Sequence, residues 1–244
     1  MRRIAIKIFI SFLLIFSISV KSQTTNHFGI FPTIGHSGTL SDKWDYSLYY
    51  FGAFNLFNPA NSGKQQAANF FIFYSEQALS YKANKNLSFT GSYVYQRVAP
   101  FEDSYVNENR FYLQATYKTN LNRISFKNRL RYDGRFIQDR FTNTYPFTSR
   151  VRYLFGVQVP LQKEKNNLYF AGYNEFFFNT FKNSTVVYAE NWASAAVGYK
   201  TARAGNWELG PLYIFWVMNK QYDLTNLFYL QLTWVTHLDF RKNK

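Results

Sequence analysis

The feature of this sequence that most constrains its fold is a strict alternation of apolar and polar residues. Near the C-terminus, Phe228, Leu230 and Trp234 alternate with the polar residues Gln231 and Thr233. A period of two sends successive side chains to opposite faces of a strand, so each such segment has one apolar and one polar face. The candidate strands are 28–40, 44–55, 69–82, 87–98, 109–119, 123–137, 147–161, 168–180, 191–202, 207–218 and 226–240.

The connections between these segments alternate between short and long. Outer-membrane barrels have short periplasmic turns and longer external loops, and their strands need about 9–11 residues to cross the membrane. The segments reach that length, and aromatic residues gather at their ends, where interfacial girdles would lie. The short connections are 83–86, 120–122, 162–167 and 203–206, and the long ones are 56–68, 99–108, 138–146 and 181–190.

We therefore predict an all-β fold, an antiparallel transmembrane β-barrel with short periplasmic turns and longer external loops. Bacterial single-chain barrels have an even number of strands, so we favour ten strands within 44–240, with twelve as the alternative. Residues 23–43 would be an N-terminal lead segment or a first strand, and 241–244 a basic tail.

The first 22 residues have the pattern of a secretory signal peptide. Arg2, Arg3 and Lys7 precede a short apolar run, and we expect cleavage near Gln23. Together with the strand pattern, this leader predicts export to the outer membrane of a Gram-negative bacterium. The expected partners are outer-membrane lipid and the barrel-assembly machinery.

Cationic side chains alternate along one central segment. The opposite face of that segment carries Leu130, Tyr132 and Phe136. Arginine facing lipid at mid-membrane would cost roughly 2–4 kcal/mol, so the cations are expected to face the lumen. Arg150 and Arg152 of the next segment are expected to join these cations. We call the set Lys127, Arg129, Arg131, Arg135, Arg150 and Arg152 the cationic ladder, and its expected acidic partners in the lumen are Asp133 and Glu175.

Such a lumen has two interpretations. Long paired side chains can fill a narrow barrel as a salt-bridge plug, or an excess of cations can form a narrow path that attracts anions. We expect a structural or transport-related barrel of unknown cargo. Because the arginines would face inward, we expect no nucleic acid as a partner.

The alternative function is a membrane-embedded enzyme acting on lipid or lipopolysaccharide. Such an enzyme would need a serine, a histidine and an orienting Asn or Asp. His237 shares a polar face with Thr233 and Asp239, but no serine is visibly in register with it. We therefore expect no enzymatic activity and name no catalytic residue. The chain has no cysteine, and neither a metal site nor a cofactor is expected.

Three short motifs resemble a known family. The stretch "KNRLRYDGRF" (127–136) is followed by "SRVRYLFGVQVPL" and by "YNEFFFN" (173–179), and "NWASAAVGYK" (191–200) stands where the next strand would be. This order resembles the uncharacterised outer-membrane barrels grouped as domain-of-unknown-function family 2490. The resemblance implies a barrel of the Gram-negative outer membrane. It implies no activity and no site residues.

Overall fold

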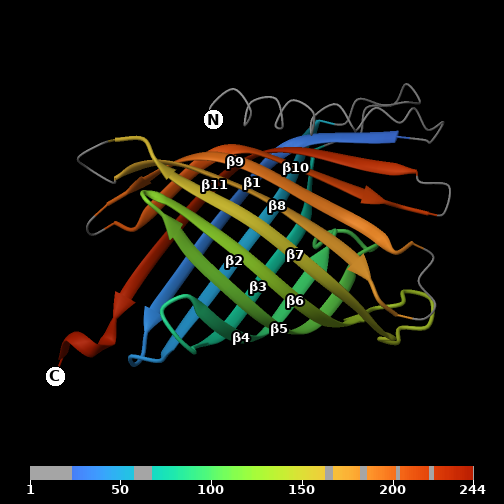
Figure 1. Cartoon of the computed structure of the whole chain (residues 1–244). Helices are drawn as coiled ribbons and strands as arrows, with labels where there is room; N and C mark the ends of the chain where they lie inside the picture. Colours follow the sequence, from blue (N-terminus) through green and yellow to red (C-terminus); the bar gives the residue numbers. More distant parts are fainter. Residues whose placement is uncertain are drawn as a thin grey trace.

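The protein is a closed β-barrel in the computed structural model (Figure 1). The structure describes residues 24–57, 68–162, 167–181, 186–201, 204–219 and 223–243, so the expected signal peptide lies outside the described residues. The strands are β1 (Thr24–Thr39), β2 (Trp44–Phe57), β3 (Asn69–Lys82), β4 (Leu87–Val98), β5 (Val106–Leu121), β6 (Ile124–Ile137), β7 (Phe147–Pro160), β8 (Leu168–Asn179), β9 (Tyr188–Lys200), β10 (Asn206–Val217) and β11 (Leu224–Asp239), followed by a short 3-10 helix, η1 (Phe240–Asn243).

The described residues form eleven strands, so the prediction of ten strands, with twelve as the alternative, is wrong. Each strand pairs antiparallel with its neighbour in sequence. The exception is the closing pair, in which β1 runs parallel to β11 from Thr24↔Leu224 to Thr39↔Asp239. The expectation of a purely antiparallel barrel is also wrong, because β1 and β11 pair in parallel. An even number of strands would have closed the barrel with an antiparallel pair. With β1 the number is odd, so the closing pair of β1 and β11 is parallel.

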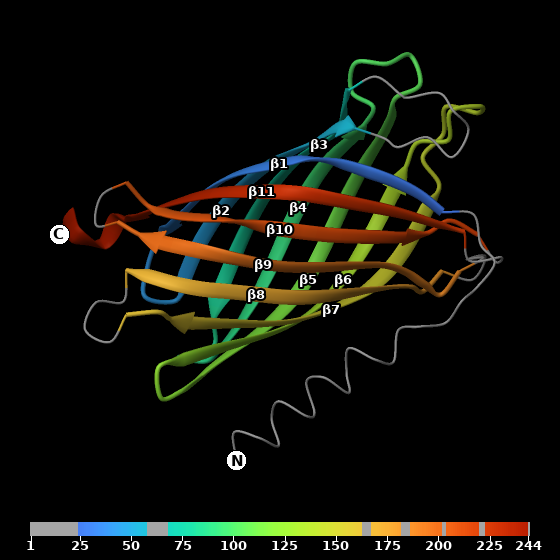
Figure 2. The same cartoon turned by 90° about the horizontal axis from the view of Figure 1, so that it is seen from above.

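The expected alternation of connection lengths is present, except that the β7–β8 connection (161–167) at the end with short turns is one residue longer than the β10–β11 connection (218–223) at the other end. The short connections, such as 83–86 and 122–123, lie at one end of the barrel, called here the tight-turn end, and the longer ones, such as 99–105 and 138–146, lie at the long-loop end. Because the strand count is odd, β1 begins at the long-loop end whereas β11 ends at the tight-turn end. Figure 2 shows the start of β1 and the C-terminal η1 at opposite ends of the barrel.

The two faces of the barrel wall differ in chemistry. On the outward face, Leu113 is 71% and Leu130 is 56% exposed, whereas on the inward face Arg131 is 5% and Asp133 is 0% exposed. The period-two pattern therefore places the charged residues inside and the apolar residues outside. Among the described residues, no helix is long and apolar enough to cross a membrane.

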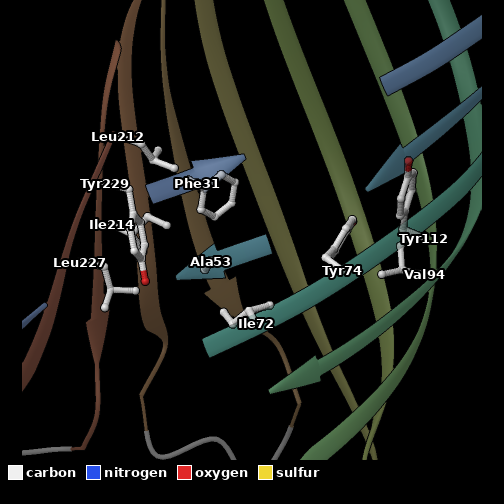
Figure 3. Close-up of a cluster of buried hydrophobic side chains, with 10 residues drawn as sticks. All are labelled: Phe31, Ala53, Ile72, Tyr74, Val94, Tyr112, Leu212, Ile214, Leu227 and Tyr229. Atoms are coloured by element: carbon white, nitrogen blue, oxygen red, sulfur yellow. The ribbon is translucent and has the colours of Figure 1, made fainter. Parts of the chain in front are cut away.

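Part of the lumen is filled by apolar side chains. Figure 3 shows Leu212, Ile214 and Tyr229 on the inner wall, near Phe31 and Ala53. These residues belong to β10, β11, β1 and β2, and the cluster continues over β3 to β5. The apolar inner wall is therefore centred on β10, β11, β1 and β2, away from β6 and β7, which carry the cationic ladder.

Candidate functional site: the barrel lumen

The strand register aligns the cations of β6 with those of β7. Arg131 is the cross-strand partner of Arg152, and Asp133 is the partner of Arg150. Like charges directly opposite one another destabilise a sheet. The arrangement therefore requires carboxylates that reach between the strands, and the structure supplies them.

Asp133 and Glu175, the two expected acidic partners, each contact two arginines. Arg150 Nε lies 2.7 Å from Asp133 Oδ2, and Arg152 Nη1 lies 3.6 Å from the same oxygen. Glu175 Oε1 accepts from Arg129 Nη2 at 2.6 Å and from Arg152 Nε at 2.8 Å. Arg152 therefore bridges the two carboxylates, and three cations of the ladder are joined through two acids.

A third acidic residue, Glu108, was not expected from the sequence. Its Oε1 lies 2.7 Å from the Nε atoms of both Arg110 and Arg135, and its Oε2 accepts from Arg135 Nη2 at 2.8 Å. Glu108 and Arg110 share the inward face of β5, and both are almost fully buried. The strand predicted from the sequence begins at residue 109, one residue after Glu108, and so does not include this carboxylate.

Glu76 and Glu190 complete the acidic set. The hydroxyl groups of Tyr74 and Tyr112 each donate a hydrogen bond to Glu76 at 2.6 Å, and Arg131 Nη1 lies 3.6 Å from this carboxylate. Glu190 lies 3.1 Å from Arg150 Nη1 and accepts from two indole N–H groups. We call the following set the buried ion network: Arg110, Arg129, Arg131, Arg135, Arg150 and Arg152 with Glu76, Glu108, Asp133, Glu175 and Glu190.

The buried ion network is close to electrically neutral. It contains six guanidinium groups and five carboxylates, and the side chain of none of them is more than 17% exposed. Lys127, the remaining member of the predicted ladder, forms no salt bridge with any described residue. The ladder is therefore divided into paired arginines at mid-barrel and one lysine nearer the tight-turn end.

A row of aromatic rings connects the charged wall to the apolar wall. Trp192 of β9 has ring centroids 5.8 Å from both Phe177 of β8 and Phe31 of β1, and Phe51 of β2 lies 4.6 Å from Phe31 and 4.2 Å from Tyr74. We call these five residues the aromatic septum. The guanidinium groups of Arg150 and Arg152 lie over the Phe177 ring, so the septum and the network are in contact.

On the tight-turn side of the septum the lumen contains a cavity of about 910 Å³, called here the vestibule. Its lining reaches the residues of the short turns, including Asn84 and Asn86, and its floor includes Arg129, Arg131 and Glu175. The lining holds eight cationic and four acidic side chains, an excess of four positive charges. The cationic side chains are Lys82, Lys85, Lys118, Lys127, Arg129, Arg131, Arg152 and Lys200.

The structure places a serine beside His237, which the sequence did not reveal. Ser37 Oγ lies 3.0 Å from His237 Nδ1, because β1 and β11 pair in parallel with Ser37 opposite His237. The other ring nitrogen lies 3.4 Å from Thr39 Oγ1. A catalytic triad needs a carboxylate or amide oxygen at that second position, and a hydroxyl occupies it here. In the described part of the chain, no group of three or more His, Asp or Glu side chains could hold a metal ion.

The fold and the lumen define a class of protein: a closed β-barrel whose inner wall carries buried Arg–carboxylate ion pairs. The chain matches the model of the family described as protein of unknown function (DUF2490) over residues 28–224, and it belongs to that family. The resemblance seen in the sequence motifs is thereby confirmed. No curated protein and no solved structure matches the chain.

Proposed function

We propose that this protein is a membrane-spanning barrel of the Gram-negative outer membrane, with a structural or transport-related role and a lumen closed at mid-barrel. The observation that carries the proposal is the reversal of polarity between its two faces. A water-soluble barrel would not leave a continuous outer wall of residues such as Leu113, Leu130, Leu209 and Leu230 exposed. A lipid bilayer covers such a wall.

The outer wall also carries aromatic pairs near both ends. At the tight-turn end, Trp207 stacks on Trp234 with centroids 5.3 Å apart, and at the long-loop end Phe28 stacks on Phe228 at 5.0 Å. Trp and Tyr are preferred at membrane–water interfaces, and aromatic girdles flank the apolar band of membrane barrels. The strands span 12–16 residues, enough to cross the hydrocarbon core when tilted.

The packing inside favours the plug over the open path. The aromatic septum contacts both inner walls, and the network residues beside it pair with one another along the charged wall. An ion passing through would have to displace the septum rings. Transport would therefore require a rearrangement of the septum, and the resting barrel is expected to be closed.

Electrical recording in planar bilayers tests this proposal, after flotation with liposomes has shown insertion. The wild type should insert and show no conductance steps. A double variant, Phe51→Ala with Trp192→Ala, removes two septum rings and should produce steps.

Phe228→Ala serves as the matched control, because it removes an aromatic ring from the outer wall and should remain silent. Steps in the wild type would contradict the closed lumen, and failure to float with liposomes would contradict the membrane location.

A further inference from the structure

One pair of like charges in the lumen has no carboxylate between its members. Lys118 and Lys127 are direct cross-strand partners on β5 and β6, and both line the vestibule. The equivalent pair deeper in the barrel, Arg110 and Arg135, shares Glu108. Neither lysine forms an ion pair with any carboxylate among the described residues. Facing ammonium groups repel each other, so an anion between them would stabilise the pair.

The adjacent cation has an unused donor. Arg129 follows Lys127 on the same face of β6, and its Nη2 is held by Glu175. Its Nε is buried and has no hydrogen-bond partner, although a buried donor without a partner costs free energy. The two ammonium groups and this N–H group belong to neighbouring positions on the vestibule wall.

There is room beside these donors for the body of a small molecule. Across the sheet, Lys127 aligns with Gly156, and Gly156 aligns with Tyr173. Gly156 has no side chain, so the wall is lower between the lysine and the tyrosine, and a Cβ atom built there would be in ordinary van der Waals contact, 3.5 Å from its nearest neighbours. The vestibule volume of about 910 Å³ is within the range of small-molecule sites.

We propose that the vestibule binds a phosphate monoester whose phosphate lies between Lys118, Lys127 and Arg129 and whose organic part lies over Gly156 against Tyr173. A compact dianion suits two lysines, which bind phosphate as point charges, and it also accepts from the guanidinium. The site goes beyond the closed-barrel function, and binding in detergent solution requires neither membrane insertion nor conductance.

Calorimetric titration of the purified full chain in a neutral detergent tests the site. Glucose phosphate should bind saturably, and unphosphorylated glucose should not. The double variant Lys118→Gln with Lys127→Gln should weaken glucose phosphate binding by about tenfold or more, since it removes two charge-assisted contacts. Gly156→Leu keeps every charge but fills the recess, and it should weaken binding as well.

Lys43→Gln is the matched control, because Lys43 is an exposed lysine at the same end of the barrel that does not line the vestibule. It should leave binding unchanged. Absence of saturable binding, or equal weakening by Lys43→Gln and by the double variant, would overturn the proposal.

Competition distinguishes two sources of the phosphate. Displacement of glucose phosphate by a short-chain phosphatidic acid supports the site and assigns it to a lipid headgroup. Failure of that lipid to compete supports the site and assigns it to a soluble ester.

Discussion

At the residue scale, the lumen depends on carboxylates that each serve two arginines. Asp133 is fully buried and contacts Arg150 and Arg152, and Glu108 serves Arg110 and Arg135 in the same way. A buried ion pair adds little net stability compared with apolar packing. Removing one partner is costly, however, because it leaves an uncompensated buried charge. The shared carboxylates are therefore the most sensitive positions in the network.

Asp133→Asn keeps the size of the side chain but removes the charge that faces Arg150 and Arg152. We expect the free energy of unfolding to fall by about 3–5 kcal/mol, measured by urea denaturation of the barrel in detergent and followed by tryptophan fluorescence.

Asp103→Asn makes the same chemical change in an exposed loop and should alter the free energy of unfolding by less than about 0.5 kcal/mol. Equal effects of the two substitutions would contradict the role assigned to Asp133.

At the element scale, β1 determines how the barrel closes. It pairs with β11 over its whole length and with β2 on its other side. Pro32 lacks an N–H group, and the β1–β2 pairing is interrupted at this point, between Ile30↔Phe54 and Thr33↔Phe51. Because β1 pairs with β11 on one side and with β2 on the other, the barrel has no unpaired edge strand that could associate with another chain.

A disulfide can test this closure, because the chain has no cysteine of its own. Thr33 and Thr233 are register partners on β1 and β11, so cysteines at the two positions should form an intramolecular disulfide on oxidation. The cross-link should be visible as altered mobility of the denatured protein in gel electrophoresis.

Cysteines at Thr33 and Thr225 form the matched control. Thr225 is eight positions from Thr233 along β11, roughly 26 Å at about 3.3 Å per residue. The control pair should stay reduced. If Thr33→Cys with Thr233→Cys also stayed reduced, the parallel closure would be wrong.

At the scale of the whole molecule, the odd number of described strands places the start of β1 and the end of β11 at opposite ends of the barrel. Thr24 lies at the long-loop end and Asp239 at the tight-turn end. In the orientation predicted from the sequence, the short turns lie in the periplasm. β1 then begins at the extracellular side of the membrane, and β11 ends at the periplasmic side. The vestibule then faces the periplasm.

Epitope tags with a protease site, one placed directly before Thr24 and one after Lys244, test this arrangement in intact cells. External protease should cleave the N-terminal tag and spare the C-terminal tag, and permeabilised cells should lose both. Protection of both tags in intact cells would indicate that the termini lie on the same side.

The sequence by itself determined the properties that depend on local pattern. Alternation in each segment determined that the fold is built of strands and that Lys127, Arg129, Arg131 and Arg135 share one face. The alternation of connection lengths indicated that short connections lie at one end of the barrel and longer ones at the other. These properties could be predicted because the side-chain period of a strand and the chemistry of a turn depend only on neighbouring residues.

Only the tertiary structure decided which distant residues meet. Glu190 reaches Arg150 from 40 positions away, and Ser37 lies beside His237 through a separation of 200. These contacts depend on the register and closure of the barrel, and a one-residue shift between strands would replace every partner. The strand count depended on a parallel pairing of the first and last strands, which no local pattern encodes.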